Sequence, residues 1–335
     1  MNLQYPMPDI IQVPYSDEHI DGVTDLLGNA DFKKIIWRWQ FQDRLNFSPI
    51  VLVDRDRQVT GFNGVMPVKV SIDGEITAAA WSCDFVVSPK ARRKGVGKQV
   101  KLALQAEYSR VMSLGISDSA VKVLKRMGWR NGGRVLAMRR LSRKRHSRDL
   151  VWLALQKALQ FLFKRVSKIK GQMEWLAQLP EKSEVDSLNE KILPDYQRCV
   201  IRDYEYLNWR YQQHPLASYQ FLALRNEQEL AALLVLKVDK EHVRIVDYLG
   251  PGNERNIRRH LLREVDVRFG KKHMLSCTSS DVDWLIVLAQ SGFLPTGKQR
   301  FYIYSETDSQ SKGWYLMAGD SDGELLQAAK GAMRQ

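Results

Sequence analysis

Three short segments in the first half of the chain recur in the same order in the second half. The matching pairs are Trp37-Arg38-Trp39 with Trp209-Arg210-Tyr211, Ser82–Val86 with Ile245–Leu249, and Leu124–Trp129 with Leu288–Phe293. Their offsets are 172, 163 and 164 residues. A period this long indicates two copies of one domain rather than a solenoid of short repeats. The length of 335 residues is also that of two ordinary domains.

Each copy is predicted to contain the same succession of helices and strands. Helical sequence comes first, then several alternating apolar runs separated by turn residues, and then helix, strand, helix and strand. In the first copy we expect helices over 18–41, 97–114 and 120–127, with a short strand over 115–118. This order predicts an α+β fold with a mixed sheet flanked by helices in each copy, and it excludes a βαβ repetition.

The basic residues of the chain are concentrated between the two copies. The segment Arg139–Lys170 holds eleven Lys and Arg against one acid, and so contributes +10 of the net charge of +13. Because the remainder is close to neutral, we expect no nucleic-acid partner, which would require a basic face on a folded domain. We therefore expect domains over 1–141 and 173–306, a basic linker helix over 142–172, and a tail over 307–335.

The linker helix is predicted to be amphipathic. Its apolar residues recur at spacings of three and four, at Trp152, Leu155, Leu159, Leu162, Val166 and Ile169. One interpretation is a helix that packs this stripe against a domain. A second interpretation is a helix that lies on an anionic membrane surface, with its lysines and arginines toward the lipid headgroups. A third, less favoured interpretation is an arm that binds nucleic acid.

The most specific motif follows an apolar strand that ends near Pro89. It reads Arg92-x-x-Gly95-x-Gly97 and opens a helix. The first backbone N–H groups of a helix have no acceptor within it, and they point at a common centre that suits an anion. Glycines let this backbone approach a diphosphate closely. The stretch is not a Walker loop or a dinucleotide fingerprint, because neither glycine pattern occurs.

This stretch resembles motif A of the GNAT N-acetyltransferase superfamily, and the resemblance covers roughly residues 8–141. Gly128-Trp129 is similar to the family's closing Gly-Phe pair. The resemblance implies that acetyl-CoA is the co-substrate and that its pantetheine and acetyl carbonyl bind the backbone of Phe85, Val86 and Val87. The residues implied to bind its pyrophosphate are Arg92, Arg93, Lys94, Gly95, Val96, Gly97 and Lys98.

The second copy departs from this pattern. In place of the motif it reads Leu249-Gly250-Pro251-Gly252-Asn253-Glu254, in which Pro251 lacks a backbone donor and Glu254 would repel a diphosphate. We therefore expect a degenerate second copy that binds no cofactor. The whole chain looks similar to bacterial tandem-GNAT proteins.

The catalytic groups are less clear in the sequence. GNAT enzymes often protonate the leaving thiolate with a tyrosine four residues before the closing glycine, and here that position is Leu124. Asp84 is the candidate general base, and the alternative is a carboxylate held in a salt bridge or turn. Weaker candidates, which packing or helix capping also explains, are Tyr108, Ser117 and Asp118. The histidine spacing fits no metal site, so none is expected.

These observations predict an acetyl-CoA-dependent N-acyltransferase that acts on a small-molecule amine, for example an amino sugar. The alternative is a non-catalytic acyl-CoA-binding sensor or scaffold. We expect a cytoplasmic protein, in peripheral contact with the membrane if the linker helix binds lipid. Three distant cysteines, no secretory signal and no long apolar run support this expectation.

Overall fold

The structure is a computed structural model that describes residues 10–28, 31–41, 48–144, 146–147, 149–163 and 169–324. The chain divides into two units. Unit 1 comprises Met1–Lys69, Ala78–Asn131 and Phe301–Ser311, and unit 2 comprises Val70–Thr77, Gly132–Arg300 and Lys312–Gln335. Each unit combines helices with a mixed sheet, so the predicted α+β class is confirmed.

The helices of unit 1 are α1 (Ile20–Leu26), α2 (Asp31–Phe41), α3 (Val96–Glu107) and α4 (Asp118–Arg126). The strands that begin in the first half of the chain are β1 (Ile11–Val13), β2 (Ile50–Val53), β3 (Val59–Ile72), β4 (Glu75–Val87), β5 (Arg110–Leu114) and β6 (Arg130–Arg140). The later helices are α5 (Asp149–Leu162), α6 (Lys182–Ile192), α7 (Tyr204–Leu207), α8 (Arg255–Phe269) and α9 (Val282–Gln290). The later strands are β7 (Gln172–Leu176), β8 (Arg198–Val200), β9 (Gln220–Asn226), β10 (Glu229–Val238), β11 (His242–Leu249), β12 (Met274–Ser279), β13 (Leu294–Ser305) and β14 (Trp314–Tyr315).

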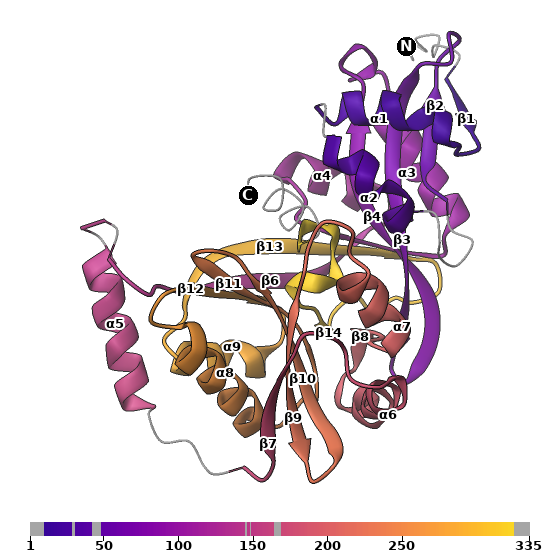
Figure 1. Cartoon of the computed structure of the whole chain (residues 1–335). Helices are drawn as coiled ribbons and strands as arrows, with labels where there is room; N and C mark the ends of the chain where they lie inside the picture. The colour runs from indigo at the N-terminus through magenta and orange to yellow at the C-terminus, as the bar shows by residue number, and fades with distance from the viewer. Residues whose placement is uncertain are drawn as a thin grey trace. The chain divides into compact units, whose positions relative to one another are not determined.

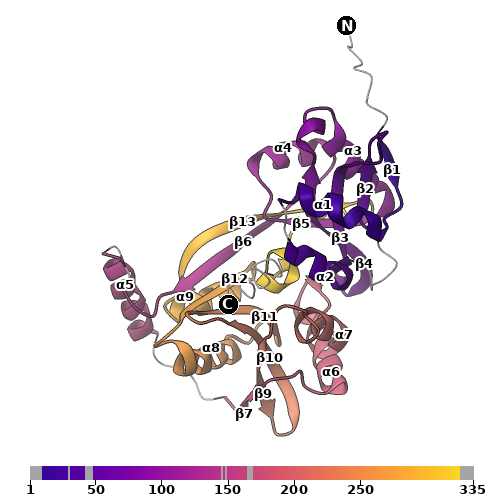
Figure 2. The same ribbon diagram turned by 45° about the horizontal axis from the view of Figure 1, so that its top comes forward.

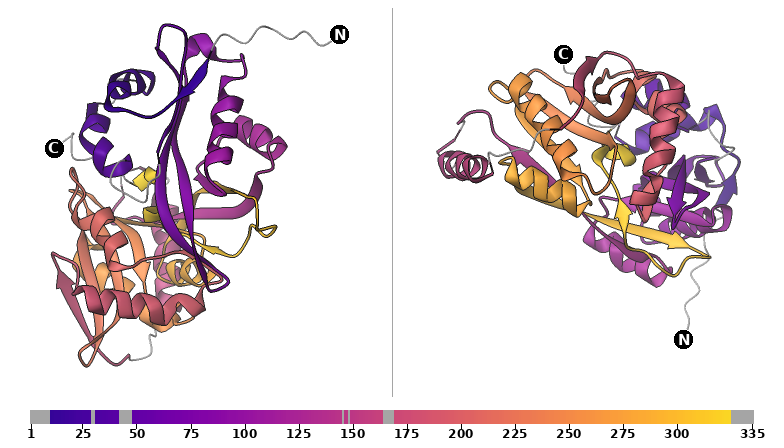
Figure 3. Two further views of the ribbon diagram at one scale, coloured as in Figure 1. Left: turned by 90° about the vertical axis from the view of Figure 1, so that its right-hand side faces the viewer. Right: turned by 90° about the horizontal axis from the view of Figure 1, so that it is seen from below.

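The sheet of unit 1 runs β1-β2-β3-β4-β5 and ends on residues 301–305 of β13. Its neighbours are antiparallel along β1, β2 and β3, whereas β4 and β5 are parallel and β5 and β13 are antiparallel. Helices α1 and α2 cover one face of these strands, and α3 and α4 cover the other (Figure 3, left). Between the sheet and α3 lies an apolar core that includes Leu52, Val65, Val100 and Leu104.

The sheet of unit 2 has the same succession of strand directions. It runs β7-β9-β10-β11-β12 and ends on β6. Its first four strands are antiparallel, β11 and β12 are parallel, and β12 and β6 are antiparallel. Helices α8 and α9 lie together on one side of these strands, and α6 and α7 lie on the other (Figures 1 and 2).

The last strand of each unit comes from the other half of the chain. Strand β6 follows α4 in sequence but pairs with β12 in unit 2, and the end of β13 pairs with β5 in unit 1. The bounds expected from the sequence, at residues 141 and 306, divide the chain consecutively. In the structure, β6 belongs to the sheet of unit 2 and the end of β13 belongs to the sheet of unit 1. Residues 1–141 therefore lack the strand of residues 301–305 that completes unit 1.

Two of the three repeated segments have matching local geometry. Gly128 and Gly292 end α4 and α9 with φ of 85° and 86°. The N–H of Trp129 bonds to the carbonyl of Leu124 at 3.0 Å, and that of Phe293 bonds to the carbonyl of Leu288 at 2.9 Å. The repeats at Ser82–Val86 and Ile245–Leu249 both lie on strands with a parallel neighbour, β4 and β11.

One predicted helix is wrong in its second half. The helix expected over 97–114 ends at Glu107, and Arg110–Leu114 forms β5. Tyr108 takes an extended conformation, and Val111 and Met112 are fully buried beside β4. Tertiary burial of this apolar run in the sheet therefore outweighs its helical propensity.

The predicted linker helix forms over part of its range, and its buried face differs from the prediction. Helix α5 ends at Leu162, and residues 164–168, including Val166 of the expected stripe, lie outside the described residues. Within α5 the buried residue is Gln156, whose amide bonds both backbone groups of Leu141. Leu155 and Leu162 of the stripe are instead 48% and 71% exposed. None of the described helices has the length and apolar content required to cross a bilayer.

Candidate functional site

Strands β4 and β5 of unit 1 stay paired over a short distance and then part. Their register joins Ala80 to Val111 and Trp81 to Met112. Beyond Trp81, β4 continues for six residues to Val87, with the edge that faced β5 no longer paired to it. The backbone of Phe85, Val86 and Val87 therefore lies on a strand edge that is not paired with β5. Phe85 is 44% exposed and the two valines are half-buried.

The loop that follows β4 has the geometry of an anion cradle. A short helical turn, Pro89–Ala91, leads to Gly95, which caps the N-terminus of α3 with φ of 84°. A left-handed cap favours glycine, because an L side chain is strained there. A Cβ atom at Gly95 would meet nothing within 4 Å, so the space over this helix end is open.

The charges around this loop suit a diphosphate. Arg92, Arg93, Lys94 and Lys98 are all exposed around the end of α3. Gly97 faces the open strand, since a Cβ atom there would lie 3.2 Å from the ring of Phe85. Loop and strand edge therefore meet as one surface, and the residues present fit the pyrophosphate and pantetheine of a coenzyme A thioester.

A cavity beside the same loop has more acidic than basic side chains in its lining. Its volume is about 520 Å³, which is within the usual range of a small-molecule site, and it touches the loop at Pro89, Lys90 and Lys94. Its other wall carries the carboxylates of Asp25, Asp54 and Asp56. Because these three acids outnumber the two lysines of the lining, this cavity suits a diphosphate less well than the exposed basic loop does.

Asp84, the candidate base, lies at an irregular point of β4. Its φ of 48° is left-handed, as at the bulges that bend a strand. Its carboxylate forms a buried ion pair with Lys33 of α2, whose Nζ also donates to Gln40 at 3.1 Å. The side chains of Asp84 and Lys33 are 6% and 2% exposed. This pairing is the salt-bridged alternative named for Asp84 in the sequence.

The structure brings a second buried cation to the same strand. Lys101 of α3 is 6% exposed, and its Nζ donates to Ser82 Oγ and Asn63 Oδ1, both at 2.7 Å. It also lies 4.5 Å from the ring centre of Phe85 and 5.7 Å from that of Trp129. Burial lowers the pKa of the Lys101 amine to about 7.

Lys101 was not among the residues predicted from the sequence, although its position carries a signal. The residue lies four positions after Gly97 and three before Leu104, on the face of α3 that packs against the sheet. A lysine on the apolar face of a helix is unusual, because its charge is rarely buried without a partner. The spacing therefore singles out Lys101 once α3 is recognised.

The other candidates of unit 1 take structural positions. Leu124 is 3% exposed and packs in the core between α3 and the sheet. Ser117 caps α4 by accepting from the N–H of Ala120 at 3.3 Å. Tyr108 Oη exchanges two hydrogen bonds of 2.8 Å with the backbone of Ser48. These contacts agree with the capping and packing expected for the serine and the tyrosine.

In unit 2 the corresponding gap between parallel strands is filled by the chain itself. Strands β11 and β12 are paired from His242 to Ile245 on β11. Past this point Met317 forms a bridge with Ser279 at the end of β12, and Leu316 exchanges backbone and side-chain bonds with Ser280. On the β11 side of this gap, the Tyr315 hydroxyl donates to the carbonyl of Tyr248 at 2.9 Å.

A buried ionic network fixes this C-terminal segment. Arg202 bonds to Asp247 of β11 at 2.7 Å and to Asp320 at 2.6 Å. Tyr211 donates to the other oxygen of Asp247 at 2.7 Å. All four side chains are nearly or fully inaccessible to solvent. The aromatic segments that sequence analysis noted are thus packing elements, and Trp37 and Trp209 are also buried.

The loop before α8 is also occupied by the protein's own groups. The N–H of Gly252 donates to the carboxylate of Asp195 at 2.9 Å, and the Tyr196 hydroxyl donates to the carbonyl of Gly250 at 2.8 Å. A Cβ atom at Gly252 would lie 2.9 Å from Asp195. A carboxylate therefore takes the place that a phosphate occupies at an open helix N-terminus.

Comparison with known proteins supports the interpretation of the fold. No protein-family model and no curated protein sequence matches the chain. Among solved structures, a GCN5-related N-acetyltransferase from Anabaena variabilis matches with a TM-score of 0.63 at 11% identity, over 88% of this chain and 72% of that one. The chain has the fold of the GCN5-related N-acetyltransferases.

Two further solved structures extend the comparison. A probable N-acyltransferase of unknown function from Enterococcus faecalis has a TM-score of 0.61 at 9% identity, and covers 88% of this chain and 72% of its own. The N-myristoyltransferase of Saccharomyces cerevisiae, solved with myristoyl-CoA, has a TM-score of 0.54 at 9% identity, and covers 88% and 82%. Each match includes more of the chain than either unit alone contains.

Proposed function

We propose that this protein is an acyl-CoA-dependent N-acyltransferase that transfers an acetyl group to the amine of a small molecule such as an amino sugar. The observation that carries the proposal is the position of the Gly95 loop. It opens α3 at the end of β4, where the edge of that strand has parted from β5. The GNAT fold of the chain and of its structural neighbours agrees with this activity.

The residues of unit 1 have separate roles in this proposal. The loop Arg92–Lys98 holds the pyrophosphate through backbone N–H groups and positive charge, and Phe85–Val87 hold the pantetheine through the strand edge. When bound, the thioester supplies the electrophilic acyl carbon. Asp84 stays the proposed base, and its proton-accepting role requires that Lys33 release it or share it with the acceptor amine.

We also propose that the two units descend from tandem GNAT copies and that the second is degenerate. Both sheets have the same succession of strand directions, with one parallel pair. The gap beside β11 contains Met317, and the loop before α8 holds the Asp195 carboxylate. Acetyl-CoA is therefore expected to bind once per chain, in unit 1.

Titration calorimetry with acetyl-CoA tests this proposal through a matched pair of glycine variants. Gly95→Glu adds a negative charge at the anion cradle, and repulsion of about 1–4 kcal/mol would weaken binding roughly 5- to 1000-fold. Gly74→Glu is the control, because Gly74 also has a left-handed φ, of 91°, and open space around its Cβ position. Equal affinities in the two variants, or two equivalent sites per chain, would contradict the proposal.

An assay of coenzyme A release distinguishes catalysis from binding of the cofactor alone. We expect thiol release with at least one class of primary amine, measured across a panel of amino sugars and other small amines. Binding of acetyl-CoA with no release from any acceptor would instead support the sensor or scaffold function.

A second candidate function is peripheral attachment to an anionic membrane through α5. Its side chains include several large apolar groups that are exposed to solvent. The exposed fractions are Leu150 54%, Val151 76%, Leu155 48%, Phe161 78% and Leu162 71%. Apolar groups of this size on one short helix are typical of a helix that enters the headgroup region of a bilayer.

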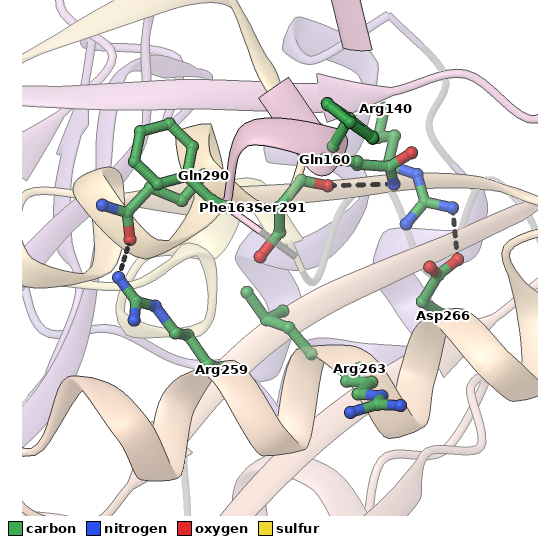
Figure 4. Close-up of a pocket in the computed structure, with 10 residues that line it drawn as sticks. Arg140, Gln160, Phe163, Arg259, Arg263, Asp266, Gln290 and Ser291 are labelled. Carbon is green, nitrogen blue, oxygen red and sulfur yellow. Dashed lines mark hydrogen bonds and ion pairs between the residues drawn. The ribbon is translucent and has the colours of Figure 1, made fainter. Parts of the chain in front are cut away.

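Attachment to an anionic membrane also requires positive charge, and a groove in unit 2 between α5, α8 and α9 carries it (Figure 4). Its volume is about 440 Å³, and Phe161 and Phe163 of the α5 end line it together with Arg259 and Arg263 of α8. Arg259 bonds to Gln290, and Arg140 pairs with Asp266, so the groove holds three guanidinium groups against one carboxylate. A lipid phosphate with its acyl chains fits this combination of charge and apolar surface.

Sedimentation with vesicles tests the membrane proposal. We expect the protein to pellet with anionic vesicles at low salt, and to be released by high salt because charge contributes to binding. The double variant Phe161→Ser, Leu162→Ser should lose this binding, whereas Ile76→Ser, which removes an apolar side chain that is 59% exposed elsewhere, should keep it. Failure of the wild-type protein to pellet with anionic vesicles would exclude this function.

A further inference from the structure

Lys101 is a buried cation without a carboxylate partner among the described residues. Its ammonium group is bonded to two neutral oxygens, those of Ser82 and Asn63, and it faces two aromatic rings. The other buried lysine of unit 1, Lys33, has Asp84 as its counter-ion. An unpaired buried charge is costly, so a protein that keeps one usually uses it.

The contacts of Lys101 place its Nζ where β4 and β5 part. Ser82 is the first residue of β4 beyond the last paired residue, Trp81. Phe85, 4.5 Å away, belongs to the open strand edge, and Trp129 directly follows α4. The ammonium group therefore lies between the strand proposed to hold the pantetheine and the end of α4.

One N–H of this ammonium group remains available for proton transfer. A protonated amine carries three N–H groups, and two of them are used by Ser82 and Asn63. These two oxygens also bond to each other, since Ser82 Oγ donates to Asn63 Oδ1 at 2.9 Å. The polar pair would therefore stay satisfied when the lysine loses its third proton.

We propose that Lys101 is the proton donor for the leaving thiolate, in place of the tyrosine that Leu124 replaces. The inference rests on the proposed acyltransferase function. In the step, the acceptor nitrogen forms a bond to the acyl carbon and the carbon–sulfur bond breaks. The sulfur keeps that electron pair and takes a proton from Lys101 Nζ, and the acceptor amine loses one proton to the base.

The acidity of Lys101 suits this task. Its pKa of about 7 lies below that of an alkyl thiol, about 8.5, so transfer of the proton to the thiolate is favourable. At neutral pH about half of the molecules carry the proton, which is the condition that general acid catalysis favours.

The first test compares two acyl donors in the variants Lys101→Met and Lys101→Gln. With acetyl-CoA we expect kcat to fall about 10²- to 10⁴-fold and KM to change little. With an acetyl thioester of an acidic aromatic thiol, which leaves without protonation, we expect kcat to stay near the wild-type value. Lys122→Met, which removes an exposed lysine of α4, is the control and should behave as wild type.

The second test needs no substrate. Nuclear magnetic resonance of the lysine side chains in the free protein should show one amine that titrates near pH 7 and is absent in Lys101→Met. A titration midpoint above about 9, or unchanged kcat with acetyl-CoA in both variants, would overturn the role of Lys101 and leave the proposed function intact. Absence of coenzyme A release by the wild-type protein would overturn both.

Discussion

Replacing Lys101 by Met should stabilise the protein, and the gain should shrink as the pH rises. In the unfolded chain a lysine titrates near 10.4, whereas in the fold burial lowers the pKa of Lys101 to about 7. Between these two values the unfolded chain binds one more proton than the native protein. The free energy of unfolding of the wild type therefore rises with pH in this window, and below pH 7 the full cost of the buried charge is present.

The size of the effect follows from the same two values. A pKa lowered from about 10.4 to about 7 corresponds to roughly 5 kcal/mol of destabilisation at low pH. Between pH 7 and pH 9.5, about 3 kcal/mol of this cost should disappear. Solvent screening reduces the effect little, because Lys101 is 6% exposed. The methionine leaves no new unpaired group, since Ser82 and Asn63 remain bonded to each other.

Urea denaturation at several pH values measures this difference. Tryptophan fluorescence follows the unfolding of both units, because Trp81 and Trp129 are buried in unit 1 and Trp284 and Trp314 are buried in unit 2. The difference in unfolding free energy between Lys101→Met and the wild type should narrow by about 3 kcal/mol from pH 7 to pH 9.5. Lys122→Met should show no such trend. A difference that is independent of pH would refute the argument that Lys101 is buried with a lowered pKa.

Three other predictions concern the charged and nucleophilic side chains. If Asp84 is the base, Asp84→Asn should lower kcat about 10²- to 10⁴-fold and leave the acetyl-CoA affinity nearly intact, whereas equal losses of activity and thermal stability would mark a structural ion pair. Arg202→Met should cost about 3–5 kcal/mol in urea denaturation, because it leaves two carboxylates buried without their cation, and a loss below 1 kcal/mol would contradict this. The thiols of Cys199 and Cys277, whose pKa values burial raises, should react with a thiol reagent only after unfolding, so rapid labelling of the native protein would show that they are accessible.

Local signals in the sequence were sufficient to predict the start of α3 at the glycine loop and most of the helices and strands. Glycines at 95 and 97 beside four basic residues predict a helix start with positive charge around it, because the backbone conformation and the charge are set by neighbouring residues. The repeated ends of α4 and α9 are equally local, since a glycine with positive φ closes each helix. Pro251, which lacks a backbone donor, and Glu254 likewise predict from the sequence that the loop before α8 forms no such cradle.

Contacts between segments that are distant in the sequence determined the strand pairing of the two units and the buried charges of the candidate site. The exchange of β6 and β13 between the units depends on which sheet edge each strand meets, and no residue of either strand encodes that choice locally. The same is true of the gap beside β11, which is filled by residues some seventy positions later, and of the Lys33–Asp84 pair. The spacing of Lys101 can place it on the buried face of α3, but its ammonium group becomes acidic only because α3, β3 and β4 enclose it. Burial, and hence the pKa, is a property of the whole packing arrangement and cannot be assigned until the tertiary structure is formed.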